Sequence, residues 1–225
     1  MKWIIDLFTS TLGRKLLMAL TGLFLILFLA VHLAGNLQLL KDDGGRAFNI
    51  YAEFMSTNPL IQTISKGNFF FILLHVGMSL VLTIRNRKAR GPERYAVTSG
   101  KSSIWASRNM GILGTIVLAF LITHLNHFWG QMHFGEMPKV TYDGTEYRDI
   151  YATVDYWFAK GWYVGVYVFC MVAVGFHLWH GFASAFQTLG LNHMKYNPVI
   201  NFVGKAFAIV VPALFAWIPI SMYFN

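Results

Sequence analysis

Four histidines stand one apiece in four separate apolar stretches of this sequence, and their side chains are the ones best placed to do chemistry. They are His32, His75, His124 and His177. An imidazole inside hydrocarbon is costly and rare, so histidines on several spans indicate a shared partner. Haem iron takes one histidine on each face, and four histidines are enough to ligate two haems. For any single histidine, structural hydrogen bonding is the alternative interpretation.

Five long apolar stretches must position these histidines. Crossing ~30 Å of hydrocarbon takes about 20 helical residues, and we expect membrane-spanning helices at about 12–40, 67–85, 104–130, 157–189 and 199–222. The first stretch is longer than the apolar region of a signal peptide, so we keep it as a span. With 56% hydrophobic and 12% charged residues, the composition leaves nothing for a soluble domain. The sequence predicts an all-α integral membrane protein, one domain over residues 1–225, with four helices in a bundle.

Lysine and arginine gather at one end of the predicted helices. With a cytoplasmic N-terminus, the inner segments carry 12 − 2 = +10 and the outer loops 6 − 8 = −2, which restores the net charge of +8. The positive-inside rule then predicts a multi-pass protein of the inner (cytoplasmic) membrane with its N-terminus inside and its C-terminus outside. The basic face either follows from this rule alone or also docks a cytoplasmic protein. It does not indicate a nucleic-acid partner.

The four histidines fall at two heights along their helices. Counted from the nearest basic or polar residue at the inner edge, His32 and His124 lie about 25 and 24 Å up, and His75 and His177 lie about 15 Å up. Two levels with two histidines each describe a four-helix bundle that holds two bis-histidine haems, with the fifth helix alongside.

Two of the histidines have a second histidine three residues later, His127 and His180. Residues three apart share a helix face, so either member of each pair is a candidate ligand. Such pairs also suggest a membrane di-iron oxygenase, but that chemistry needs its histidines clustered near one membrane face, with carboxylates. A transporter would explain polar groups in the membrane, but it predicts inverted repeats or broken helices that the sequence does not show.

Shorter signals place helix ends and turns outside the spans. Asn58-Pro59 is suited to begin a helix, and Ser102 or Ser103 to cap the third span. Residues 46–55 alternate apolar and polar positions helically, which predicts an outer surface helix. Asp143-Gly144 predicts the tight turn of a small hairpin.

Short motifs in a fixed order extend along nearly the whole chain. They are Ser10-Thr-Leu-Gly-Arg-Lys15 with Ala19-Leu-Thr-Gly22, His32-Leu-Ala-Gly-Asn36, His75 with Arg85-Asn-Arg-Lys-Ala-Arg90, His124-Leu-Asn-His-Phe128, and Phe176-His-Leu-Trp-His-Gly181. In order and spacing these motifs resemble the five-helix dihaem cytochrome b membrane anchor of succinate dehydrogenases and fumarate reductases. The likeness is strongest to the bacterial type with a single anchor polypeptide.

The resemblance implies an inner haem b held by His75 and His177 and an outer haem b held by His32 and His124. It thereby selects His124 and His177 from the two histidine pairs. It also implies a flavoprotein subunit and an iron–sulfur subunit as partners, assembled into a complex that can form higher oligomers. Electrons would pass between the iron–sulfur subunit and a membrane quinone, with menaquinone expected. The chain has one cysteine and no flavin motif, so it would not bind succinate itself. Another quinone-linked dihaem cytochrome b is the alternative.

Polar residues near both ends are candidates for the quinone and for the haem propionates. Glu53 is the candidate for quinone proton transfer, because it falls between the first two spans near the level of His32. The other candidate quinone residues are Asn36, Gln38 and His127 outside, and Ser10 and Arg14 inside. The candidate propionate partners are Arg85 and Arg87 inside and Arg148 outside. For each, an interfacial polar residue or a helix terminus is the alternative.

Overall fold

Five long apolar helices dominate the computed structural model, which describes residues 2–91 and 104–225. The model is 83% helical, and the predicted all-α membrane fold is confirmed. Four spans coincide wholly or largely with single helices, α2 (Thr11–Asn36), α4 (Pro59–Arg90), α9 (Gly161–Thr188) and α10 (Asn197–Phe224). The remaining span, Met110–Phe134, consists of α6 (Met110–His124), η2 (Leu125–Gly130) and α7 (Gln131–Phe134).

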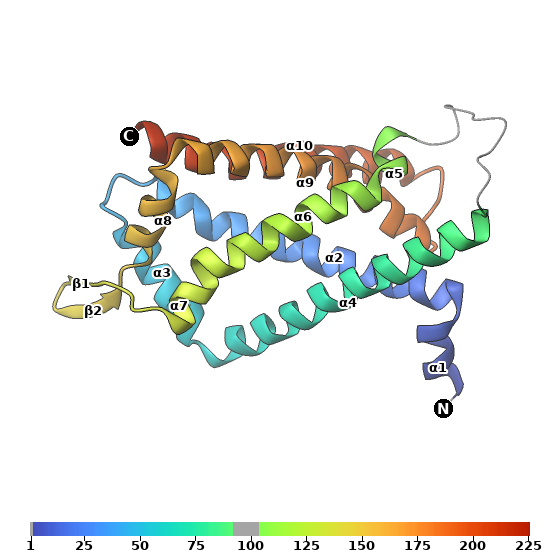
Figure 1. Cartoon of the computed structure of the whole chain (residues 1–225), viewed down its shortest axis with the longest axis horizontal. Helices are drawn as coiled ribbons and strands as arrows, with labels where there is room; N and C mark the ends of the chain where they lie inside the picture. Colours follow the sequence, from blue (N-terminus) through green and yellow to red (C-terminus); the bar gives the residue numbers. More distant parts are fainter. Residues whose placement is uncertain (1, 92–103) are drawn as a thin grey trace.

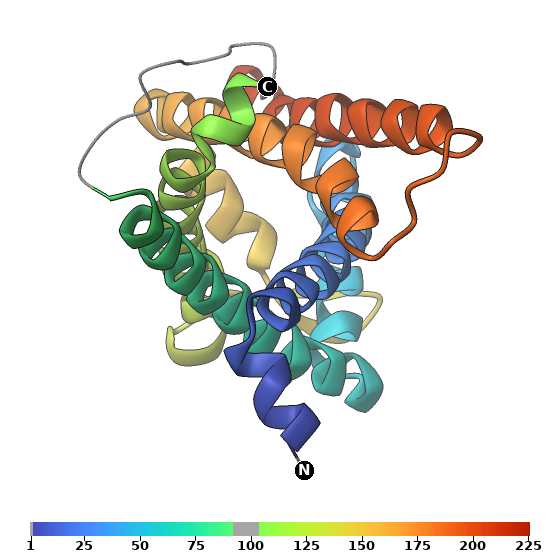
Figure 2. The ribbon, with the colours of Figure 1, turned by 90° about the vertical axis from the view of Figure 1, so that its right-hand side faces the viewer.

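The long helices run lengthwise beside one another (Figure 1). α9 packs along α10, α2 contacts both α4 and α9, and α6 contacts α9. Seen along the bundle, α2, α4, α6 and α9 surround a common axis, and α10 lies against α9 and α2 (Figure 2). Many outward apolar side chains, such as Leu27, Leu73 and Phe169, are largely exposed, as expected for helices that face lipid.

Helix boundaries differ from the expected ones at the second, third and fourth spans, and the third begins at Met110 rather than near residue 104. α4 begins at Pro59 rather than near residue 67, because Asn58 caps it by accepting hydrogen bonds from the backbone N–H groups of Leu60 and Ile61. The fourth span begins at Gly161 rather than 157. Residues before it form a separate short helix, α8 (Ile150–Phe158), and the chain is extended at Lys160 between the two helices.

The third span follows the short helix α5 (Trp105–Arg108). The predicted caps Ser102 and Ser103 lie outside the described residues, as do three charges counted in the inner segments, Glu93, Arg94 and Lys101. Within this span η2 is a π-type segment that begins directly after His124. Such segments interrupt the regular α-helical turn and often occur at functional sites.

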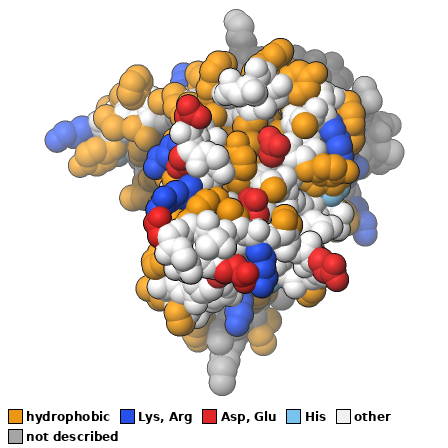
Figure 3. Space-filling view, turned by 90° about the vertical axis from the view of Figure 1, so that its left-hand side faces the viewer, with side chains coloured by type: hydrophobic (Ala, Val, Ile, Leu, Met, Phe, Trp, Pro, Cys, Tyr) orange, Lys and Arg blue, Asp and Glu red, His pale blue; other side chains and the backbone are white. Residues whose placement is uncertain are grey.

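One end of the bundle carries the predicted surface helix and hairpin, and we call it the hairpin end. The 3₁₀ turn η1 (Leu37–Leu40) leads to α3 (Arg46–Thr57), and strands β1 (Lys139–Tyr142) and β2 (Thr145–Arg148) pair antiparallel. Both predictions are confirmed. Asp143 and Gly144 have φ angles of 52° and 80°, which the tight hairpin turn requires. Figure 3 shows carboxylates and basic side chains gathered over this end.

A fully buried asparagine joins the elements of the hairpin end. Asn49 on α3 donates to Asp149 Oδ1 at 2.9 Å and to Tyr142 Oη at 3.2 Å, and accepts from the Tyr151 backbone N–H at 2.8 Å. Asp149 also caps α8. Since a buried amide is costly unless its bonds are made, these bonds fix how α3, the hairpin and α8 meet.

At the opposite end the chain starts with a helix that the sequence interpretation did not separate. α1 (Lys2–Thr9) turns sharply away from α2 (Figure 1), and Ser10 begins α2 by accepting a hydrogen bond from the Gly13 N–H at 3.0 Å. Trp3, Ile5 and Phe8 on α1 are exposed.

Candidate functional site

Two of the four histidines meet near the hairpin end. The rings of His32 on α2 and His124 on α6 have their centres 5.9 Å apart and are nearly perpendicular. Aromatic rings surround them: Phe28 and Phe215 lie against His32, and Phe120 lies against His124. His124 Nδ1 is 2.8 Å from the hydroxyl of Tyr167 on α9.

The other two histidines meet further along the bundle. The ring centres of His75 on α4 and His177 on α9 are 6.4 Å apart. His75 Nδ1 is 3.0 Å from the hydroxyl of Thr21 on α2. His177 Nδ1 is buried and has no hydrogen-bond partner within the described part of the chain. The four histidines therefore form two pairs, each joining two different helices, and the pairs are the ones expected from the heights of the histidines along their helices.

The spacing of both pairs fits two imidazoles on opposite faces of one metal ion. Bonds of about 2.0 Å on each side, plus roughly 1.1 Å from each nitrogen to its ring centre, give about 6 Å between ring centres. The observed 5.9 and 6.4 Å lie at this value. Helix backbones also come close to the His75–His177 pair, because a Cβ on Gly22 would lie 3.4 Å from His75 and one on Gly114 3.9 Å from His177. The donor set and spacing fit haem b.

The tertiary structure separates the two members of the His124–His127 motif. His124 faces His32, whereas His127 stacks on Trp157 with ring centres 3.8 Å apart and accepts or donates a hydrogen bond with the Tyr163 hydroxyl at 2.9 Å. The π-type turn η2 contains His127 but not His124, so the two rings do not stay on one face as they would in a regular helix. In the second motif, the ring opposite His75 is that of His177.

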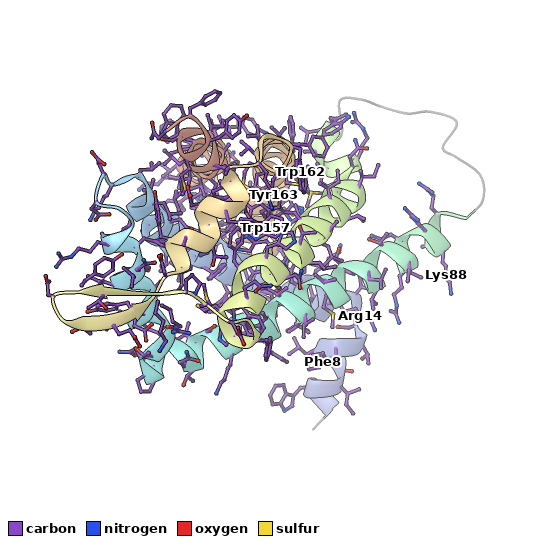
Figure 4. All side chains as sticks on the ribbon, turned by 60° about the vertical axis from the view of Figure 1, so that its left-hand side comes forward. Phe8, Arg14, Lys88, Trp157, Trp162 and Tyr163 are labelled. Atoms are coloured by element: carbon purple, nitrogen blue, oxygen red, sulfur yellow. The ribbon has the colours of Figure 1, made fainter. Side chains whose placement is uncertain are left out.

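An aromatic cluster surrounds His127 at the hairpin end. Trp157 and Tyr163, labelled in Figure 4, lie with ring centres 5.0 Å apart, and the Lys160 ammonium lies 4.2 Å from the centre of the Trp157 ring. A cleft of roughly 340 Å³ adjoins the cluster, lined by Gln131, Pro138, Ala152, Thr153, Tyr156 and Trp157. A smaller cleft of roughly 170 Å³ lies between the facing ends of α9 and α10.

The structure pairs two residues for which the sequence predicted separate roles. Arg148 Nε on β2 donates to Glu53 Oε2 on α3 at 3.0 Å, and the Arg148 guanidinium also contacts Ser56. Both charged side chains are 30% exposed, so water reaches this ion pair. The roles of Glu53 in proton transfer and of Arg148 at a propionate stay predictions, and any such role must act within this pair.

The predicted inner pair is also engaged locally. The Ser10 hydroxyl caps α2, and Arg14 Nε donates to the Phe8 carbonyl at 2.7 Å. Arg14 is buried, and its Nη1 has no hydrogen-bond partner among the residues that the structure describes. Figure 4 shows Arg14 at the junction of α1 and α2, with Phe8 on α1 and Lys88 near the end of α4.

Four further candidates have simple surroundings. Asn36 Nδ2 donates to the His32 carbonyl at 2.7 Å, so it lies next to a histidine of the pair. Gln38 lies in η1. Arg85 and Arg87 are exposed near the C-terminus of α4, where cations complement the helix dipole.

Sequence reasoning missed the hydroxyl groups that contact the histidines. Thr21 and Tyr167 contact His75 and His124, and Tyr163 contacts His127. Thr21 lies within a motif noted above, next to Gly22, and the two tyrosines are four residues apart on a histidine-bearing span. These positions in the sequence could have indicated hydroxyl groups near the histidines, but only the helix arrangement shows which histidine each hydroxyl contacts.

Comparison with protein-family models, curated proteins and solved structures finds no match for this chain.

Proposed function

We propose that this chain is a membrane cytochrome b subunit that passes electrons between an iron–sulfur partner and a membrane quinone. The two histidine pairs carry the proposal, since ring centres 5.9 and 6.4 Å apart on four helices suit two bis-histidine haems. The resemblance to the anchors of succinate dehydrogenases and fumarate reductases supplies the partner class. The resemblance also implies which side of the membrane each haem lies on, with the His75–His177 pair nearer the cytoplasm.

In this proposal the chain's own residues hold, orient and insulate the cofactors. His75 and His177 would hold the inner haem b, and His32 and His124 the outer one. Each haem b supplies a one-electron couple when bound. The phenylalanine rings packed against His32 and His124 give that level an apolar lining. The quinone exchanges two electrons and two protons, and Glu53 and His127 are the candidate groups for its protons at the hairpin end.

Nothing in the described structure favours the di-iron alternative. Among residues 2–91 and 104–225, no three histidine, cysteine or carboxylate side chains come together in a group that could hold a metal ion. A di-iron site needs such a cluster, whereas a bis-histidine haem needs two rings facing each other.

The first prediction is the haem content of the purified protein. Because four ligands form two pairs, we expect two non-covalently bound b-type haems per polypeptide. The test is a reduced-minus-oxidised spectrum together with a haem-to-polypeptide ratio from a haem extract. A ratio near one would show that only one of the two histidine pairs binds haem, and an absence of haem would refute the proposed function.

The second prediction concerns the partner surface. Arg87 and Lys88 lie in the exposed last turn of α4, so reversing both to glutamate should weaken recovery of the iron–sulfur and flavoprotein subunits in co-purification. The loss should grow with salt, because screening weakens the remaining attraction. Reversing Lys41 and Lys139 at the hairpin end is the matched control and should leave recovery unchanged. If the unmodified protein, the Arg87/Lys88 variant and the Lys41/Lys139 control recover the partner subunits equally at every ionic strength, the α4 end is not the docking surface.

A further inference from the structure

The hydroxyl group of Thr21 has one proton, and the surroundings show where that proton goes. Thr21 Oγ1 lies 2.7 Å from the Leu17 carbonyl, one helical turn earlier, and 3.0 Å from His75 Nδ1. A carbonyl can only accept, so a 2.7 Å contact between two oxygens requires the hydroxyl to donate to Leu17. This is the common back-bond of threonine inside a helix.

With its proton used, the Thr21 oxygen can only accept a hydrogen bond from His75. The bond at 3.0 Å therefore has His75 Nδ1 as donor, which means that Nδ1 carries the ring proton. Thr21 is only 2% exposed, so water does not compete for the contact. In a neutral imidazole with a protonated Nδ1, the bare nitrogen is Nε2, and a bare nitrogen is what a metal ligand needs.

The two neighbouring positions on α2 act together. Thr21 supplies the oxygen, and Gly22 lies directly beside the His75 ring, since a Cβ there would be in van der Waals contact with Cε1 at 3.4 Å. The opposite member of the pair has no such support from the described residues, because His177 Nδ1 is buried and finds no hydrogen-bond partner among residues 2–91 and 104–225. The two histidines of this level therefore differ in their hydrogen bonding.

We infer that Thr21 is a positioning residue that fixes the tautomer of His75 and would strengthen His75 as a ligand of the inner haem. The inference rests on the proposed function. A histidine that donates its second N–H to an oxygen becomes a more basic ligand, and this favours the more highly charged, oxidised iron. Thr21 thereby lowers the midpoint potential of the haem held by His75 and His177 relative to the same ligands without the bond.

Redox titration of the purified complex tests this role. In Thr21→Val, which keeps the shape and removes the hydroxyl, we expect the midpoint potential of the inner haem to rise and that of the outer haem to stay unchanged. We also expect the inner haem to transfer to apomyoglobin about tenfold faster, which is the typical cost of losing such a support. Thr21→Ser, which keeps a hydroxyl, should restore both properties.

Each outcome decides the inference. An unchanged inner potential in Thr21→Val overturns it, and so does an equal shift in Thr21→Ser, because packing alone would then be the cause. A shift of the outer haem instead would show that the levels are wrongly assigned. If the valine variant does not assemble, Thr21→Ala removes the same hydroxyl without adding bulk. Absence of haem from the unmodified protein would refute the proposed function, whereas unchanged potentials refute only the role of Thr21.

Discussion

Replacing His124 with alanine is expected to halve the haem content of the protein, from two haems per polypeptide to about one. The ring centres of His124 and His32 are 5.9 Å apart, so the substitution would leave one face of the proposed haem without a ligand. The remaining haem should be the one between His75 on α4 and His177 on α9. A haem extract and a reduced-minus-oxidised spectrum of the purified variant measure both results.

His127→Ala is the matched control for this experiment. His127 is in the same motif, three residues away, but its ring stacks on Trp157 and bonds to Tyr163 rather than facing His32. We expect this variant to keep both haems. If His127→Ala loses a haem while His124→Ala retains two, the ligand at this level is His127 and the pairing is wrong.

Replacing Glu53 with glutamine is expected to slow quinone-linked turnover about a hundredfold, the usual scale for loss of a general acid–base group. Both haem spectra and succinate oxidation by an artificial dye should be unchanged, because neither needs the carboxylate. The measurement compares quinone-linked and dye-linked rates on the same preparation of the complete complex.

The ion pair with Arg148 requires two controls. Glu53→Gln also removes the ion pair between α3 and β2, in which Arg148 Nε lies 3.0 Å from Glu53 Oε2, so the controls must separate a displaced hairpin from the loss of the carboxylate. Arg148→Gln removes the same ion pair but keeps the carboxylate, and it should turn over faster than Glu53→Gln. Glu146→Gln removes the carboxylate of the exposed pair with Lys139 on the same hairpin and should behave as the unmodified protein. Equal slowing by Glu53→Gln and Arg148→Gln would assign Glu53 a structural role and move the search to Ser10 and Arg14.

The sequence alone determined the features that depend on local patterns. Charge-free length predicted the five spans, because each helix must satisfy its own backbone hydrogen bonds in lipid. Helical periodicity predicted the surface helix α3, and Asp143-Gly144 predicted the hairpin, because its turn needs positive φ angles. Even the levels of the four histidines followed from counting, since a helix rises by a constant ~1.5 Å per residue.

The sequence predicted helix boundaries less closely where the backbone changes direction near the end of an apolar stretch. The fourth span was expected to begin near residue 157, inside the last turn of α8, and only the extended backbone at Lys160 shows that α9 begins at Gly161. Hydropathy reports burial in lipid, not backbone direction. For the same reason it could not show that α1 turns away from α2 (Figure 1).

Only the tertiary structure decided which side chains meet. Thr21 reaches His75 across 54 residues of sequence, and Arg148 reaches Glu53 across 95. The choice between His124 and His127 depends on a π-type turn and on the rotation of the third span. Height along a helix follows from residue number, but the direction in which a side chain points depends on how each helix is turned against its neighbours. Packing between helices sets that rotation.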